Sequence, residues 1–134
     1  MYSSGQGVAR DDAEAVRWFR KAAEQGDATA QNDLGKAYAT GEGAARDQGQ
    51  AARWFRKAAD QGEATAQGRL GVMYLAGVGV PQDYVQAYMW LNLSAAQGLK
   101  RAAEERDKLA QSMTPAQIAQ AKKLVREWKP IAGR

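Results

Sequence analysis

The sequence contains neither cysteine nor histidine. Without cysteine the chain has no disulfide bond and no redox-active thiol, which fits the cytoplasm and also allows the periplasm. The absence of both residues excludes the commonest zinc sites, cysteine–histidine nucleophiles and the Ser-His-Asp triad. An enzyme of this composition would have to work with carboxylates, Lys, Arg, Tyr or Ser alone. We therefore expect a non-catalytic protein that uses no metal and no cofactor.

Long apolar runs are missing as well. No stretch approaches the roughly 18 uninterrupted apolar residues that a membrane-spanning helix needs. The N-terminal stretch MYSSGQGVARDD has neither the basic nor the apolar region of a secretory signal. Because a signal can be removed during export, cytoplasmic and periplasmic locations both stay open. The length of 134 residues, 45% of them hydrophobic and 25% charged, is that of one foldable domain.

Positive charge gathers at the C-terminal end of the chain, which carries Lys122, Lys123, Arg126, Lys129 and Arg134. One interpretation is a nucleic-acid partner. The other is an exposed end helix, whose C-terminus favours cations. No platform of aromatic residues for stacking bases accompanies these charges, so we favour the exposed helix and do not expect nucleic acid as a partner.

The sequence repeats itself with a period of 36 residues. RWFRKAAEQG at 17–26 returns as RWFRKAADQG at 53–62 and, more loosely, as MWLNLSAAQG at 89–98. A fixed period of about 20–50 residues is typical of a solenoid, whose units bury their apolar faces only by stacking on one another. The sequence thus predicts a single repeat domain over 1–134, with repeats at 2–37, 38–73 and 74–109.

Each repeat is predicted to form two helices. The first begins at an aspartate that has Glu or Gln three residues later, the spacing of a capping box: Asp11 with Glu14, Asp47 with Gln50, and Asp83 with Gln86. Apolar residues with a 3.6-residue period follow, and we expect the tryptophans among them to lie in the core: Trp18, Trp54 and Trp90. In the central repeat we expect Trp54→Ala to cost about 3–5 kcal/mol of stability.

Glycines separate the helices. Gly26, Gly62 and Gly98 are predicted to end the first helix of each repeat. The second helix ends at a Gly-x-Gly pair, which recurs at 5–7, 41–43 and 77–79. A phosphate-binding loop needs a strand before it. Because these pairs follow a helix and recur with the repeat, we interpret all three as turns.

These residues resemble the Sel-1-like repeat, an αα-hairpin relative of the tetratricopeptide repeat. The family pattern stands here as Leu34, Gly35, Tyr38, Gly41, Gly43, Asp47, Ala51, Trp54, Ala58, Ala59 and Gly62. The resemblance covers about residues 2–109. It implies an all-α solenoid, a right-handed superhelix of helix pairs. It also implies an adaptor that holds other proteins or peptides in its groove, often in bacterial signalling or envelope assembly.

The C-terminal part resembles the closing helix of many bacterial members, and we predict a capping helix at 114–129. Thr114 has the position of an N-cap and Pro115 that of the first helical residue. The predicted buried stripe is Ile118, Ala121, Leu124, Val125 and Trp128. Arg106 and Asp107 take the place that Leu-Gly has in the earlier repeats. We therefore expect the last second helix to meet the capping helix rather than another repeat.

The N-terminal edge is open, because the chain begins within a repeat and no helix pair precedes the first one. Either the chain is part of a longer array, or this edge serves for self-association. Both interpretations stay open from the sequence.

The predicted binding surface lies on the first helices, opposite the tryptophans. If these helices line the inner curve, as the resemblance implies, a ladder that begins charged and ends apolar would bind a protein or peptide. Its members are Arg17, Lys21, Glu24, Arg53, Lys57, Asp60, Met89 and Leu93. The charges would orient the partner and the apolar end would supply affinity. Alternatively, the charged members are ordinary exposed residues and the capping helix covers Met89 and Leu93.

Two rival functions have weaker support. Some cysteine-rich family members are associated with β-lactam binding, but they carry a disulfide in each repeat and this chain has none. Nucleic-acid binding through the basic C-terminal end would show as a steep loss of affinity with added salt. We favour a non-catalytic scaffold that binds a protein or peptide on the concave face of the solenoid.

Overall fold

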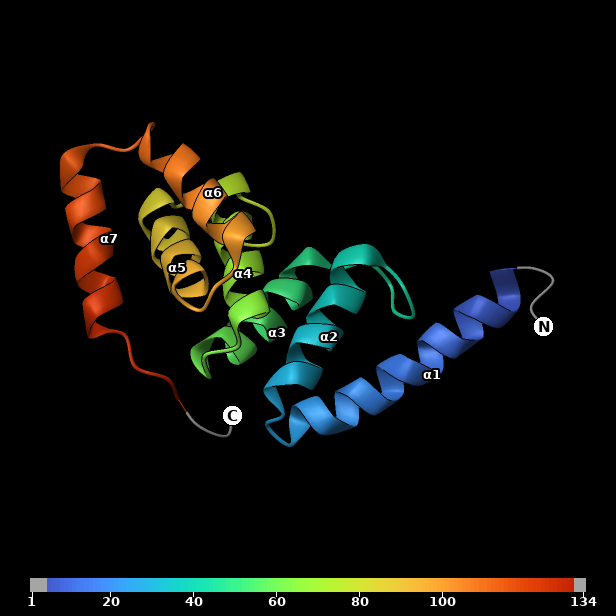
Figure 1. Ribbon diagram of the computed structural model, residues 1–134. Helices are drawn as coiled ribbons and strands as arrows, with labels where there is room; N and C mark the ends of the chain where they lie inside the picture. Colours follow the sequence, from blue (N-terminus) through green and yellow to red (C-terminus); the bar gives the residue numbers. More distant parts are fainter. Residues whose placement is uncertain (1–4, 132–134) are drawn as a thin grey trace.

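The computed structural model describes residues 5–131, with side chains from residue 11 onward (Figure 1). Within this part of the chain there are seven helices and no strand, so the all-α prediction is confirmed. We use "first helices" for α1, α3 and α5, and "second helices" for α2, α4 and α6. The bounds are α1 (Gly5–Glu24), α2 (Ala28–Thr40), α3 (Gln48–Asp60), α4 (Ala64–Ala76), α5 (Tyr84–Ala96), α6 (Lys100–Ala110) and α7 (Pro115–Glu127).

The helices form a solenoid because each helix from α1 to α6 packs against the next one along the chain. The core follows this stack. Val16, Leu34 and their neighbours fill the space between α1 and α2. Phe55 and Leu70 belong to the central part of the core, and Leu91 to the part nearest the C-terminal end.

The tightest crossings join a second helix to the following first helix. A methyl group placed on Gly35 of α2 would lie 2.7 Å from Cδ1 of Phe55 in α3. On Gly71 of α4 it would lie 2.8 Å from Cγ of Leu91 in α5. Both glycines are buried. The large side chain therefore fills the space that the glycine leaves, and any side chain at position 35 or 71 would push the helices apart.

The predicted helix ends are mostly confirmed. Asp47 and Asp83 accept hydrogen bonds from the backbone N–H groups of Gln50 and Gln86, each at 3.1 Å. At the start of α7, Thr114 forms a reciprocal capping box with Gln117. The stop glycines adopt left-handed φ values of 98°, 97° and 103°, which other residues rarely adopt. They are Gly26, Gly62 and Gly98.

The prediction for the first repeat was wrong, because α1 begins at Gly5 and includes both the first Gly-x-Gly pair and Asp11. In the two later loops, the second glycine packs against an earlier first helix, Gly43 against α1 and Gly79 against α3. A methyl group on Gly43 would lie 2.3 Å from the carbonyl oxygen of Asp12. Helix α1 instead continues through the first Gly-x-Gly pair.

The tryptophans differ in burial although they occupy equivalent positions. Trp90 is 1% exposed and Trp18 is 66% exposed, while Trp54 is intermediate. The prediction that all three lie in the core was therefore wrong for Trp18 and overstated for Trp54. The physical reason is α7, whose Trp128 packs edge-on against Trp90 with ring centroids 6.4 Å apart. No such helix covers the other two positions in the described chain.

The capping helix packs against α5 and not chiefly against α6, as Figure 1 shows. The expected contact with the last second helix was therefore wrong. Asp107, whose side chain is 69% exposed, replaces the glycine that allows the close crossing in α2 and α4. Arg106 instead donates a hydrogen bond to Asn92 in α5 at 2.8 Å. After α7 the chain runs back to α3, where Ile131 N–H donates to the carbonyl oxygen of Asp60 at 2.7 Å.

Buried glutamines link one repeat to the next, a feature that we did not predict. Gln61 donates to the side-chain oxygen of Gln31 at 2.9 Å, and Gln97 donates to that of Gln67 at 2.8 Å. Gln31 and Gln67 are fully buried. These bonds satisfy polar groups inside the core and so fix the offset between repeats. In the third repeat the equivalent residue is Ala103, and the series ends there.

We expect the close crossings to tolerate no side chain. Gly71→Ala should lower the free energy of unfolding by about 1–3 kcal/mol, because the added methyl group would overlap Leu91. Gly49→Ala is the matched control, since Gly49 is an exposed helical residue of α3 whose added methyl group would make only an ordinary contact, 3.4 Å from Oδ1 of Asp47. It should raise the free energy of unfolding by up to about 1 kcal/mol through helix propensity. Urea titration of both variants measures the difference, and equal effects would contradict the crossing.

The three equivalent tryptophans should give graded losses of stability. Trp90→Ala should cost about 3–5 kcal/mol, because it leaves a cavity beneath α7. Trp18→Ala should change stability by no more than about 0.5 kcal/mol, as for other exposed positions. Trp54→Ala should fall between them. Denaturant titrations of the three variants would contradict this order if Trp18→Ala proved the most destabilising.

Candidate partner-binding groove

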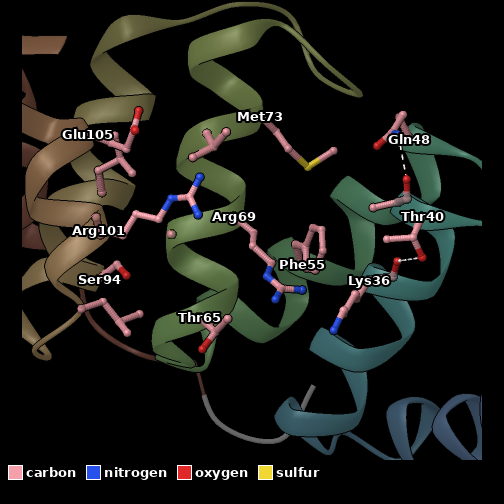
Figure 2. Close-up of a pocket in the computed structure, with 16 residues that line it drawn as sticks. Lys36, Thr40, Gln48, Phe55, Thr65, Arg69, Met73, Ser94, Arg101 and Glu105 are labelled. Carbon is pink, nitrogen blue, oxygen red and sulfur yellow. Dashed lines mark hydrogen bonds between the residues drawn. The ribbon is translucent and has the colours of Figure 1, made fainter. Parts of the chain in front are cut away.

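An open groove of about 560 Å³ runs along α4 between α2 and α6 (Figure 2). The second helices supply its walls, and residues of α3 and α5 lie between them. The close crossings position these side chains, because α3 packs against α2 at Gly35 and α5 packs against α4 at Gly71. Phe55 and Leu91, the two side chains at the crossings, thereby also line the groove.

The groove has an apolar floor with exposed apolar residues above it. Phe55, Met73 and Leu91 are at least nine-tenths buried and belong to the core. Val72 is 43% exposed and Leu99 is 36% exposed, and both line the groove. Large exposed apolar side chains that gather in a hollow are typical of an interaction site.

The charged residues of the groove are mostly positive. Lys36 lies on α2, Arg69 on α4 and Arg101 on α6, with Glu105 as the acidic member. Figure 2 shows Arg69 near the middle, between Lys36 on one side and Arg101 with Glu105 on the other. The Arg69 guanidinium lies 5.7 Å from the ring centroid of Phe55. No ion pair joins Glu105 to these cations in the described part of the chain, so the cations are available to a carboxylate.

None of the eight ladder residues lines this groove. The ladder lies on the first helices, and on that side the capping helix packs against α5, so the ladder stays a prediction separate from this groove. Met89 is 7% exposed, within the core cluster against which Leu93, Leu124 and Val125 pack. The apolar end of the ladder is thus covered by the chain itself, as the alternative interpretation held.

The charged end of the ladder is exposed on α1 and α3. Arg17 pairs with Glu14, and Asp60 accepts a hydrogen bond from Arg56 at 3.2 Å. Lys21 and Lys57 lie over the rings of Trp18 and Trp54, at 5.3 and 5.4 Å from the centroids. Arg53 and Glu24 are exposed. These residues form a surface of their own, apart from the groove.

Sequence reasoning missed the groove residues, although one signal was available. Val72 occupies a solvent-facing position of α4 at which the other repeats have Lys36 and Lys108. This departure from the repeat was the one signal in the sequence that pointed to the groove. The groove itself needed the three-dimensional arrangement, because α2, α4 and α6 meet only through the stacking.

Other kinds of site find little support among the described residues. No group of three His, Cys, Asp or Glu side chains there could hold a metal ion. None of the described helices combines the length and the apolar character needed to cross a membrane. Lys122, Lys123 and Arg126 are exposed on α7, and none of them lines the groove.

Comparison with known proteins gives one family. The Sel1 repeat model matches residues 1–27, 28–63 and 64–99. Its second and third units begin at α2 and α4, so it divides the same period at a different phase from the repeats predicted above. The unit 28–63 joins α2 with α3, the pair that meets at the close crossing of Gly35. No sequence among the curated proteins matches the chain.

Two solved structures are similar. One is a protective antigen present in uropathogenic Escherichia coli strains, which displays an SLR fold. It is 41% identical over 87% of this chain, with a TM-score of 0.83. The other is a Sel1 repeat protein from Oxalobacter formigenes, 37% identical over 70% of this chain, with a TM-score of 0.68. The matched regions make up 25% and 39% of those two chains.

Proposed function

We propose that this chain, which belongs to the Sel1 repeat family, holds a segment of a partner protein in the groove along α4. Sel1 repeat proteins generally mediate protein–protein interactions, and their fold is generally a non-catalytic scaffold. The observation that carries the proposal is the pair of exposed apolar residues, Val72 and Leu99, within a hollow that three cations border.

The groove suits a peptide segment that combines apolar and acidic side chains. Covering Val72 and Leu99 would remove apolar surface from water, at about 25 cal/mol per Å². Lys36, Arg69 and Arg101 are spread over three helices and would meet carboxylates along the segment. Such charges chiefly set the orientation and the rate of association, whereas the buried apolar contacts hold the complex together.

Substitution in the groove should weaken binding of such a segment. The probe is a linear peptide selected from a random library against the unmodified chain. Val72→Asp should lower its affinity at least about tenfold, because a carboxylate would be buried against the apolar part of the peptide. Calorimetric titration measures the change, and circular dichroism checks that the variant remains helical.

Val78→Asp is the matched control. Val78 is 40% exposed, close to the 43% of Val72, but it does not line the groove. Its substitution should leave the peptide affinity unchanged. If both valine variants bind the selected peptides as well as the unmodified chain does, the groove is not the binding site.

A further inference from the structure

We infer that the exposed face of α1 and α3 around Trp18 and Trp54 is a second docking surface, and that its partner is an acidic amphipathic helix. This surface is separate from the groove, since neither tryptophan lines it. We call it the tryptophan face, and define it by Trp18, Lys21, Arg53, Trp54 and Lys57.

The chain itself shows that an amphipathic helix fits this kind of surface. Trp90 is equivalent to Trp18 and Trp54 by the 36-residue period. Helix α7 covers it with Trp128, whose ring meets that of Trp90 at 77° with centroids 6.4 Å apart. Leu124 and Val125 pack against the same part of the core. The third repeat is therefore a covered version of a surface that the first two repeats leave exposed.

The charge of the surface changes between the covered and the exposed repeats. Beside Trp90 stand Met89 and Leu93, which match the apolar stripe of α7. At the same two positions α3 carries Arg53 and Lys57, and α1 carries Arg17 and Lys21. A helix that covers these cations must bring carboxylates, because burying an unpaired cation under apolar side chains is unfavourable.

The cations of the tryptophan face are largely available to a partner. Within the described residues, Lys21, Arg53 and Lys57 form no ion pair with an acidic side chain. Lys21 and Lys57 lie over the indole rings instead. Trp18, at 66% exposure, is the most exposed of the large apolar side chains in the described chain. Exposed tryptophan beside cations is typical of the residues that dominate protein interfaces.

The exposed face continues directly from the covered one. After α7 the chain reaches the end of α3, where Ile131 donates its N–H to the carbonyl oxygen of Asp60. Trp128 and Pro130 lie beside Gly62 at the same place. A partner helix on α1 and α3 would therefore lie next to this segment and extend the layer that α7 begins.

A second copy of the chain is a poorer occupant. Its own amphipathic helix, α7, presents Leu124 and Val125 from its buried side and carries Lys122 and Lys123 on its exposed side. Placed on α3, it would cover Arg53 and Lys57 with apolar side chains and add further positive charge nearby. Both effects disfavour the contact.

The test uses two synthetic peptides of equal length. The acidic probe has the sequence of residues 113–131 with Lys122→Glu, Lys123→Glu, Leu124→Glu and Arg126→Glu. Ile118, Val125 and Trp128 are kept, so the aromatic residue and the stripe other than Leu124 remain. The control peptide has the unmodified sequence. We expect the acidic probe to bind at least about tenfold more tightly, and its affinity to fall as salt screens the exposed charges.

The four tryptophan indole N–H signals in the NMR spectrum report where the probe binds. The signals of Trp18 and Trp54 should shift on titration, while those of Trp90 and Trp128 should stay in place because α7 already covers them. Lys21→Glu combined with Lys57→Glu should lower the affinity at least about tenfold. The matched control combines Lys122→Glu with Lys123→Glu on the exposed side of α7, outside both surfaces, and should leave the affinity unchanged. A groove variant that combines Lys36→Glu with Arg69→Glu shows whether the probe binds in the groove instead.

The outcomes separate this inference from the function proposed for the groove. If the groove variant abolishes binding of the acidic probe while the Lys21 and Lys57 variant does not, the tryptophan face is not the site and the groove proposal stands. If the chain dimerises by light scattering and Trp18→Ala makes it monomeric, a second copy occupies the face and the inference is overturned. Weaker binding of the library-selected peptides to the Val72→Asp variant tests only the function proposed for the groove.

Discussion

The rest of the structure depends on the contact between a glycine of one helix and a large side chain of the next. At Gly35 and Gly71 the second helix has no side chain, so Phe55 and Leu91 lie almost against its backbone. This contact determines how α3 packs on α2 and how α5 packs on α4, and the hydrogen bond from Gln61 to Gln31 fixes the same offset between the first two repeats. With α3 and α5 seated in this way, α2, α4 and α6 line a common groove.

The residue at this glycine position of the second helix also determines where the solenoid ends. In α6 the glycine is replaced by Asp107, which no following helix can approach as closely. Helix α7 instead packs against α5, on the side of the first helices. It buries Trp90 and the neighbouring Met89 there, and leaves the groove between α2 and α6 uncovered. The replacement of glycine by Asp107 is thus linked both to the surface that α7 covers and to the groove that stays open.

Local features of the sequence were predictable and long-range ones were not. The caps at Asp47 and Asp83 depend on residues three positions away, and the stop at Gly62 depends on its own backbone angle. The exposures of Trp18 and Trp90 could not be read from their equivalent positions in the repeat. They depend on whether α7, which joins the stack only through folding, lies over the ring. The groove residues Arg69 and Arg101 were missed because the groove, too, forms only when the helices stack.

In a repeat protein, residues that bind a partner are expected at exposed positions where the sequence departs from the repeat. Buried positions must keep the repeated residues so that the units can stack. Val72 replaces a lysine in the groove. Met89 and Leu93 replace cations beside Trp90, and those positions are the ones that α7 covers. The cations that remain, Arg53 and Lys57, border Trp54, which α7 does not cover. The departures at Met89 and Leu93 therefore coincide with a change in what lies over that surface, because there the chain itself covers it.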